Sequence, residues 1–481
     1  MTDQRVSPDL IGSQPNAGPA AYSPRQWLRR VAAHRSIQQL GWVTGSYMGC
    51  QVLRLASNVM LARLLAPQLF GVMLIVNTLR TGVELLSDIG VGQSIISHPD
   101  GARPAFFNTA WTLQIIRGVI LFCASLALAG PVAGLYEEAE LAVVLPAISV
   151  IFLLTGLEAP ARFLLQKRQD LKRYAIFDLC VNIFSLMLHV GLALYTPTVW
   201  ALVGGLLLST LVSSVGSFIL LRPSIYRLQL DRTSAGQILS FGKWVFASSL
   251  IYFLSMSFDR LYFAEAIPFA LLGVYGVART FADMGALFMQ RIGNILIFPR
   301  IAASARTGTA LRAAIAPTRG RALAAVVLAL SGAIALSDQV ILLLYDDRYQ
   351  AAAFMLPILM VGVWFSILAS MGEAIMMGVA LPGHAARANL VKLVWTCAGL
   401  PLALTYAGMA GALLVIASSD MVRYASLTLS QRSQGVSFGR HDLALTTCLL
   451  FMVVAWRTLF TGVGLTPGLA DWWNLGADLH A

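Results

Sequence analysis

Long apolar runs separated by short polar loops dominate the chain from residue 38 onwards. Each run is long enough for an α-helix to cross roughly 30 Å of hydrocarbon, which takes about 20 residues. The tail that follows the last run, with Trp472 and Trp473, is too short and interrupted to predict a further span. The thirteen predicted helices cover residues 38–64, 69–96, 105–130, 141–165, 174–194, 199–221, 237–261, 268–298, 322–343, 351–380, 388–405, 410–430 and 442–463.

The first twelve runs form two series of six that share sequence features. Gly41-Trp42 and the segment 67–72 (PQLFGV) are followed just over 200 residues later by Gly242-Lys243-Trp244 and the segment 268–274 (PFALLGV). Because six spans return the chain to the side where it started, both series begin on the same side of the membrane. Parallel repeats around an axis along the membrane normal are therefore expected, an architecture found in transporters with a midplane site.

This repeat predicts an all-α polytopic membrane protein built of two six-helix bundles around a central cavity. One or two extra helices follow at the C-terminus. The predicted parts are a polar and basic tail (1–36), an N-terminal bundle (37–222), a linker (223–236), a C-terminal bundle (237–430) and an additional span with a short tail (431–481).

The composition supports a membrane protein and excludes other classes. Of the 481 residues, 57% are hydrophobic and only 12% are charged, whereas a soluble domain carries about 25% charged residues. A soluble enzyme, a disordered protein and a disulfide scaffold are excluded. The five cysteines all fall in apolar runs without a metal-ligand spacing, so we expect buried thiols. They are Cys50, Cys123, Cys180, Cys397 and Cys448.

The net charge of +11 is distributed asymmetrically along the chain. If the N-terminus is cytoplasmic, the loops on that side hold twenty Lys and Arg, and the opposite loops hold one, Arg348. Such an excess orients membrane proteins with short loops. We therefore predict a cytoplasmic N-terminus, and the basic charge indicates no binding of nucleic acid.

Twelve further bases lie inside or at the ends of the predicted spans. On insertion scales a base at the bilayer centre costs at least about 2.5–3.5 kcal/mol, so many of them must face a wet cavity or a partner acid. Arginine binds phosphate oxygens bidentately, so cations that converge on a cavity favour an anionic, phosphate-bearing substrate. The candidate cavity cations are Arg54, Arg80, Arg117, Lys243, Arg279 and Arg291.

Acids inside the spans have two interpretations, ion pairing with a neighbour or carriage of a proton through a transport cycle. Arg80 with Glu84 and Arg279 with Asp283 have the i,i+4 spacing of a helical ion pair. His189 stands alone in an apolar run and is interpreted as a core histidine. The other intramembrane acids are Asp88, Asp178, Glu158 and Glu373.

Signatures of catalysis, metal binding and cofactor binding are lacking in the sequence. It contains no phosphate-binding Walker motif, no H-E-x-x-H and no strong metal cluster. We therefore expect a protein that is not an enzyme, with no catalytic residue, no metal and no cofactor. Transport would then depend on an ion gradient, a substrate gradient or a partner.

Several segments resemble the bacterial polysaccharide-biosynthesis flippases, the Wzx-type branch of the multidrug/oligosaccharidyl-lipid/polysaccharide exporter superfamily. After Gly41-Trp42 these are 58–71 (NVMLARLLAPQLFG) and 86–96 (LSDIGVGQSII), followed by 108–111 (NTAW) and the basic turn 166–169 (QKRQ). The resemblance covers roughly residues 36–430. One departure is a thirteenth span without a clear fourteenth, where many relatives have twelve or fourteen.

The resemblance implies a multi-pass protein of the bacterial inner membrane that moves undecaprenyl-diphosphate-linked oligosaccharide to the periplasmic leaflet. The product would be exopolysaccharide, capsule or the O-antigen of lipopolysaccharide. Lipid-linked oligosaccharide, membrane lipids, a polysaccharide polymerase and other assembly proteins are the implied partners. In such families the first two helices of each bundle line the cavity, which adds Asp259 to the candidate acids.

Two alternatives remain open. A drug/cation antiporter of the same superfamily would favour an acidic or aromatic cavity, and the excess of intramembrane bases argues against it. A membrane-embedded polysaccharide polymerase or ligase would carry a large loop on the outer side, whereas every predicted outer loop between helices has about ten residues or fewer.

Overall fold

The computed structural model describes residues 35–168, 170–220, 226–296, 308–378, 381, 383–468 and 472. Within these ranges the side chains of residues 35–40, 43–44, 97, 239–248, 288–296 and 378 lie outside the description. All regular structure in the described part is helical, and each predicted span overlaps a helix. The polar tail before Arg35 and Trp473 lie outside the described residues.

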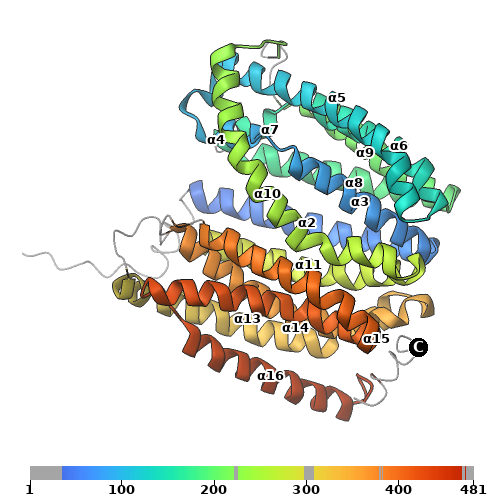
Figure 1. The fold of residues 1–481 in the computed structure, drawn as a ribbon, viewed down its shortest axis with the longest axis vertical. Helices are drawn as coiled ribbons and strands as arrows, with labels where there is room; N and C mark the ends of the chain where they lie inside the picture. The colour runs from blue at the N-terminus through green and yellow to red at the C-terminus, as the bar shows by residue number, and fades with distance from the viewer. Residues whose placement is uncertain are drawn as a thin grey trace, which may run out of the picture.

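The N-terminal helices pack into one bundle and the C-terminal helices into a second, which gives a two-lobed molecule (Figure 1). The N-terminal lobe contains α2 (Arg35–Leu64), α3 (Pro67–Leu86), α4 (Val91–Ser97), α5 (Pro104–Leu135), α6 (Ala139–Leu157), α7 (Ala161–Lys167), α8 (Leu171–Tyr195) and α9 (Val199–Ser217). The C-terminal lobe contains α10 (Arg232–Ala266), α11 (Phe269–Leu296), α13 (Gly308–Leu344), α14 (Gln350–Gly378) and α15 (Gly383–Ser433), with α16 (Gly439–Gly462) on its outer side.

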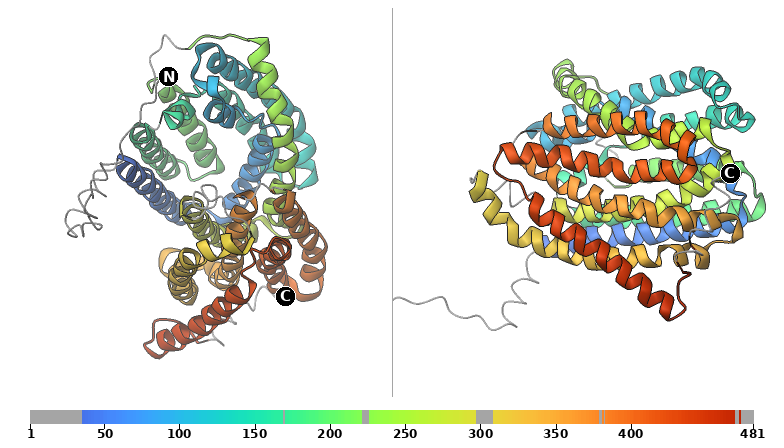
Figure 2. Two further views of the ribbon diagram at one scale, coloured as in Figure 1. Left: turned by 90° about the vertical axis from the view of Figure 1, so that its left-hand side faces the viewer. Right: turned by 60° about the horizontal axis from the view of Figure 1, so that its bottom comes forward.

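Equivalent helices make equivalent contacts in the two lobes. α2 packs on α8 as α10 packs on α15, and α5 packs on α6 as α13 packs on α14. The lobes meet mainly where α3 lies against α11 and α10, and α10 runs diagonally from one lobe to the other (Figure 1). The additional helix α16 lies along α13 at the outer edge (Figure 2).

Two predicted spans are wrong as single helices, because each breaks near the same end of the N-terminal lobe. The span 69–96 is divided into α3 and α4 around Gly90, which has a positive φ of 70° and whose N–H donates to Asp88 Oδ1 at 2.8 Å. The span 141–165 is divided into α6 and α7 before Pro160, a residue without an N–H to continue the helix. The predicted spans 388–405 and 410–430 lie in the two arms of α15, which are separated at Gly408, a residue with a non-helical conformation (φ 58°, ψ −157°).

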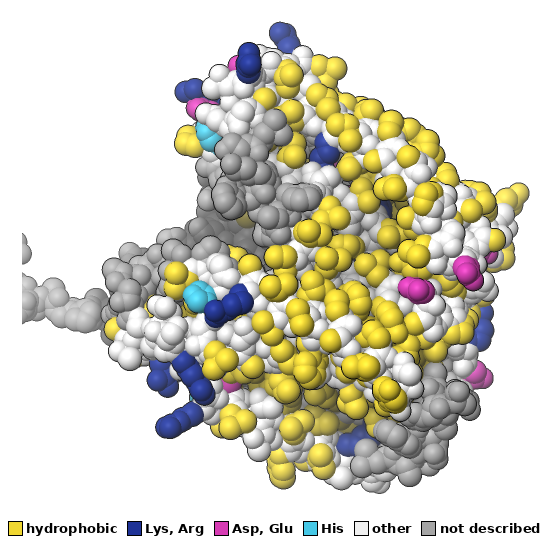
Figure 3. Space-filling model, in the orientation of Figure 1, with side chains coloured by type: hydrophobic (Ala, Val, Ile, Leu, Met, Phe, Trp, Pro, Cys, Tyr) yellow, Lys and Arg dark blue, Asp and Glu magenta, His cyan; other side chains and the backbone are white. Residues whose placement is uncertain are grey.

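The surface has the distribution expected for a chain that crosses a membrane. In Figure 3 hydrophobic side chains cover the middle of the molecule, and most of the lysine and arginine lies toward one edge. We call this edge the basic end; it carries the loops 98–103, 226–231 and 434–438. The opposite end carries the loops 65–66, 136–138, 196–198, 267–268 and 345–349.

Nine helices in the described part are long and apolar enough to cross a membrane, and α15 is long enough to do so twice. With 30, 35 and 28 residues, α2, α10 and α11 also have the length to span hydrocarbon. The prediction of buried thiols holds only for Cys50. The other four cysteines are free and exposed, because their apolar helix faces point outward, where a membrane protein meets lipid.

Buried ion pairs fasten α16 to the rest of its lobe. Arg319 donates to both carboxylate oxygens of Asp442, and the Tyr424 hydroxyl donates to the same carboxylate at 2.7 Å. Toward the other end of the helix, Arg457 lies 2.7 Å from the fully buried Asp338. Because each charge has an opposite partner, these groups are tolerated inside an otherwise apolar lobe.

Candidate substrate cavities between and within the lobes

Two glycines bring the lobes into backbone contact at the end of the molecule opposite to the basic end. A Cβ atom added to Gly71 would lie 2.1 Å from the carbonyl oxygen of Phe269, and one added to Gly273 would lie 1.9 Å from that of Pro67. These glycines occupy the same place in the two repeated segments that the sequence pointed to. Only glycine permits α3 and α11 to approach this closely.

Arginines from both lobes strengthen this closure by a reciprocal contact. Arg63, in the last turn of α2, donates to the carbonyl oxygens of Leu344 and Leu343 at 3.1 and 3.5 Å, at the end of α13. Arg348, just after α13, donates to the carbonyl oxygens of Ala62, Arg63 and Leu65 at 3.2–3.4 Å, at the end of α2. A cation beside the last carbonyls of a helix satisfies free acceptors and complements the helix dipole. We call this pair of contacts the arginine clamp.

Side chains behind the clamp complete the closure. The Tyr345 hydroxyl donates to Asn58 Oδ1 at 2.8 Å, and the rings of Phe70 and Tyr349 pack edge to face across the lobes. Arg348 also donates to the carboxylate of Asp346, which holds the pKa of Asp346 below its usual value. The two lobes are therefore joined at the opposite end by backbone contact, hydrogen bonds and aromatic packing.

Beneath this closure lies the N-terminal cavity, about 440 Å³ in volume, between α2, α3, α8, α9 and α11. Its lining has one charged side chain among the described residues, Arg54. Within the described part of the chain, Arg54 makes no ion pair and no hydrogen bond. The other polar side chains of the lining are uncharged groups: Ser57, Asn58, Asn77, Asn182, Ser185, His189 and Thr280.

The C-terminal cavity, about 200 Å³ between α10, α11, α14 and α15, has a different character. Its charged lining residues are joined in ion pairs. Arg279 Nε lies 3.1 Å from Asp283, and Arg260 also contacts the Asp283 carboxylate. Arg423 lies 3.7 Å from Asp420 and also contacts Glu373.

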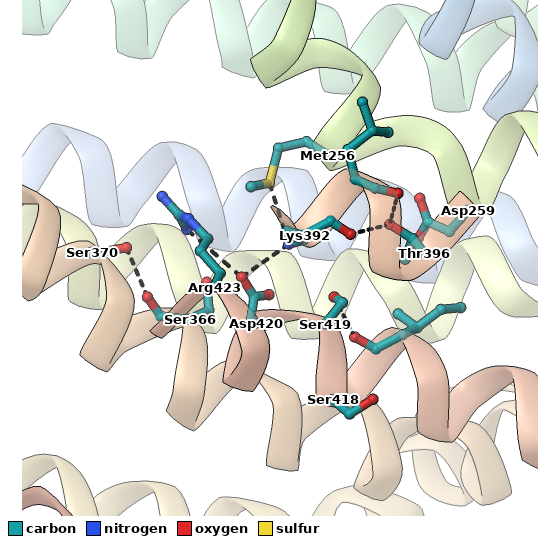
Figure 4. A network of polar contacts seen from close by, with 12 residues as sticks. Met256, Asp259, Ser366, Ser370, Lys392, Thr396, Ser418, Ser419, Asp420 and Arg423 are labelled. Carbon is teal, nitrogen blue, oxygen red and sulfur yellow. Dashed lines mark hydrogen bonds and ion pairs between the residues drawn. The ribbon is translucent and has the colours of Figure 1, made fainter. Parts of the chain in front are cut away.

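A second layer of paired charges lies behind this lining (Figure 4). Lys392 is 3% exposed, and its ammonium lies 2.9 Å from Asp420. Asp259 accepts from the Tyr275 hydroxyl and lies 3.7 Å from Arg279. Among the described residues the network contains four bases and four acids, so its charges cancel. They are Arg260, Arg279, Lys392 and Arg423 with Asp259, Asp283, Glu373 and Asp420.

Other predicted residues lie around a third cavity, about 460 Å³, inside the N-terminal lobe between α3, α4, α5 and α6. Arg117 lines it and donates to Ser87 Oγ and to the carbonyl oxygen of Glu84. Glu84 forms its expected helical pair with Arg80 at 2.8 Å. These side chains hold the break between α3 and α4, and Asp88, another lining residue, caps Gly90 there.

Glu158 lies at the corresponding break between α6 and α7. It is buried and 3.4 Å from Arg162, one helical turn further on. The Gln114 amide donates to the carbonyl oxygens of Thr155, Gly156 and Glu158, so the last turn of α6 has hydrogen-bond partners. Of the remaining predicted cations, the side chains of Lys243 and Arg291 lie outside the described residues.

The six predicted cations thus do not gather in one cavity among the described residues. Arg54 lines the N-terminal cavity, Arg279 the C-terminal cavity and Arg117 the third. Sequence reasoning missed Asp420, the acid shared by Lys392 and Arg423. It also missed the three asparagines of the N-terminal cavity, whose signal is an amide inside each of three apolar spans.

The chain is similar in sequence to known proteins. Residues 60–354 match the model of a family described as "Polysaccharide biosynthesis protein". The teichuronic acid biosynthesis protein TuaB of Bacillus subtilis is 23% identical over 290 residues, which are 57% of each chain. The lipopolysaccharide biosynthesis protein WzxC of Escherichia coli is 23% identical over 252 residues, 52% of this chain and 51% of WzxC. The matches therefore span about half the length of these curated relatives.

The fold is similar to that of a solved transporter. The lipid II flippase MurJ in an inward closed conformation superposes with a TM-score of 0.72 at 10% identity, over 91% of this chain and 96% of MurJ. At this identity the likeness concerns the fold alone. A fold of two helical lobes is thus one that a lipid flippase also has.

Proposed function

The chain belongs to the polysaccharide biosynthesis protein family, and we propose that it is a flippase for lipid-linked oligosaccharide. It would move undecaprenyl-diphosphate-linked repeat units from the cytoplasmic to the periplasmic leaflet of a bacterial inner membrane. The repeat units would then be used for exopolysaccharide, capsule or O-antigen. A diphosphate cannot cross hydrocarbon unaided, so the protein must supply a polar path while the polyprenyl tail stays in lipid.

The observation that carries this proposal is Arg54 in the N-terminal cavity. A guanidinium inside a membrane-spanning lobe normally has an anionic partner, as Arg279 and Arg423 do. Arg54 has none in the described part of the chain and faces a cavity between the lobes. A phosphate oxygen of the substrate would supply the missing anion through charge-assisted hydrogen bonds.

Alternating access is the proposed mechanism. With the basic end cytoplasmic, as the charge asymmetry favours, the clamped opposite end faces the periplasm, and the described conformation precedes release. Capture of the head group from the basic end would be followed by rocking of the lobes. Gly71 would then separate from Phe269, and the arginine clamp would open. Substrate can drive this change only if it binds the two states with different affinity.

The structure gives less support to the two alternatives. A drug/cation antiporter would need a carboxylate available to a cationic drug, but Asp283 and Asp420 in the C-terminal cavity are both ion-paired. A polymerase or ligase would need a domain to work on the glycan at the opposite end. The described loops there are short, the longest between helices being residues 345–349.

The first experiment is deletion of the gene, followed by lipid extraction, mass spectrometry and assay of surface polysaccharide. A flippase predicts accumulated undecaprenyl-diphosphate oligosaccharide of one repeat unit that faces the cytoplasm, together with loss of the polymer. Cytoplasmic orientation, measured as protection of the glycan from a periplasmic glycosidase, separates a flippase from a polymerase. Unchanged lipid intermediates and a normal polymer, in a genome without a second such gene, would refute the proposal.

A further inference from the structure

The N-terminal cavity has chemistry beyond the capture of a phosphate, because most of its polar groups are uncharged. Asn58, Asn77 and Asn182 come from α2, α3 and α8 and reach one space. Ser185 and His189 on α8 extend the same polar surface. We call these five residues the amide pocket.

The amide pocket retains both donors and acceptors for a ligand. Asn58 Oδ1 accepts from Tyr345, which leaves the Asn58 amide N–H groups for a ligand. The Asn182 amide donates to the carbonyl oxygen of Asp178 at 2.8 Å, which leaves Oδ1 as an acceptor. His189 Nδ1 forms a hydrogen bond with the carbonyl oxygen of Ser185 at 2.8 Å, so Nε2 is available to a ligand. Asn77 has no hydrogen-bond partner within the described part of the chain.

This mixture identifies the class of ligand. A bare anion needs donors and a metal cation needs acceptors, whereas a hydroxyl group both donates and accepts. A ligand with many hydroxyl groups therefore matches three amides, a serine and a histidine. The cavity, about 440 Å³, lies in the range of sites that hold small organic molecules.

The neighbouring groups position such a ligand. Arg54 lines the same cavity, so a phosphate bound there would place the sugar attached to it among the asparagines. On the other wall, Gly273 and Gly276 of α11 present no side chain and leave room for a ring. In the C-terminal cavity, by contrast, a hydroxyl group would have to compete with ion pairs for every charged partner.

We propose that the amide pocket is the saccharide subsite, where hydroxyl groups of the first sugars after the diphosphate bind to Asn58, Asn77 and Asn182. This inference rests on the proposed function and adds that separate residues recognise the two parts of the substrate. Arg54 recognises the diphosphate of any substrate, and the amide pocket recognises the glycan. In the described structure Asn77 and Asn182 make no hydrogen bond to the C-terminal lobe, whereas Asn58 does. Asn77 and Asn182 are therefore the residues to substitute in a test.

The test is a binding measurement on the full chain in lipid nanodiscs with three probes. These are undecaprenyl diphosphate without sugar, the lipid-linked oligosaccharide extracted from the deletion strain, and the free oligosaccharide released from it by mild acid. The double variant Asn77→Ala/Asn182→Ala is compared with Ser366→Ala/Ser370→Ala, which removes two hydroxyls from the C-terminal cavity. Binding of undecaprenyl diphosphate also reports whether each variant is folded.

The asparagine variant should bind the lipid-linked oligosaccharide about tenfold or more weakly, as expected for two lost hydrogen bonds, and undecaprenyl diphosphate within twofold of the native chain. Its affinity for the free oligosaccharide should fall by the same factor, and the serine variant should change neither. An equal loss for both lipid probes, or no loss for either, would overturn the subsite. Failure of the native chain to bind undecaprenyl diphosphate would instead refute the proposed flippase.

Discussion

The two main cavities use polar residues in opposite ways. In the C-terminal cavity every charged lining residue has a partner. Arg260 and Arg279 join α10 to α11, and Arg423 joins α15 to α14. In the N-terminal cavity Arg54 is unpaired in the described chain and is surrounded by uncharged amides and hydroxyls. Paired charges hold helices together, whereas unpaired polar groups are available to a ligand. This difference fits a structural role for the charges of the C-terminal cavity and the proposed binding of substrate in the N-terminal cavity.

The largest expected effect is the removal of Asp420, which tests whether the C-terminal network supports the fold. Asp420→Asn should leave Lys392 and Arg423 without their shared acid and destabilise the protein by about 3–5 kcal/mol. Thermal unfolding in detergent measures this loss. The double variant Lys392→Met/Asp420→Met, which removes the opposite charges together, should recover most of the stability. A double variant as unstable as Asp420→Asn would contradict the assignment.

Removal of Arg54 should reduce transport and leave stability unchanged, the reverse of the effect expected for Asp420. Arg54→Ala should reduce transport about 10- to 100-fold, the loss of about 1.5–3 kcal/mol of charge-assisted hydrogen bonding to phosphate. The unfolding temperature should stay the same, because Arg54 has no partner to lose in the described chain. Restored surface polysaccharide in the deletion strain reads out transport, and Arg54→Lys should retain part of it. Full activity of Arg54→Ala would remove this residue from the mechanism.

A methyl group at the lobe contact should shift the conformational equilibrium. Gly273→Ala places Cβ against the carbonyl oxygen of Pro67 and should disfavour the clamped state by about 1–3 kcal/mol. Distances between spin labels placed across the opposite end should lengthen. Gly130→Ala, on α5 with open space around its Cβ, is the matched control. Unchanged distances in Gly273→Ala would show that the contact is not required for closure.

The smallest expected effect is that of the clamp alone. Arg348→Ala should weaken the closed state by about 0.3–1 kcal/mol, the usual contribution of a cation at a helix C-terminus. The pKa of Asp346 is lowered, so its pairing with Arg348 is fully present above the ordinary carboxyl range and is lost only as the pH falls through the lowered value. The same spin-label distances should therefore be constant from pH 8 to pH 5. Opening within that interval would mean that another group titrates.

Much of the fold could be predicted because hydrophobic length is a local property. Each of the thirteen apolar runs overlaps a helix in the described part of the chain, and the repeated glycines lie at the contact between the lobes. The breaks at Gly90 and Pro160 could not be placed, since glycine and proline also occur inside continuous spans, as Pro146 does in α6. Of the candidate charges, the i,i+4 pairs Arg80–Glu84 and Arg279–Asp283 form as their spacing indicated.

The sequence by itself determined that this is a membrane protein of helical repeats, because the energy of burying apolar runs depends on composition and length alone. It also marked Arg54 as a cation that needs an explanation. Only the tertiary structure decided which charges that are distant in the sequence form ion pairs. Lys392 and Asp420 are 28 residues apart in the sequence, so no helical spacing predicts that they pair. Their pairing arises where the two arms of α15 meet α10. The amide pocket also depends on the tertiary structure, because three asparagines on three helices form one site only when the helices pack.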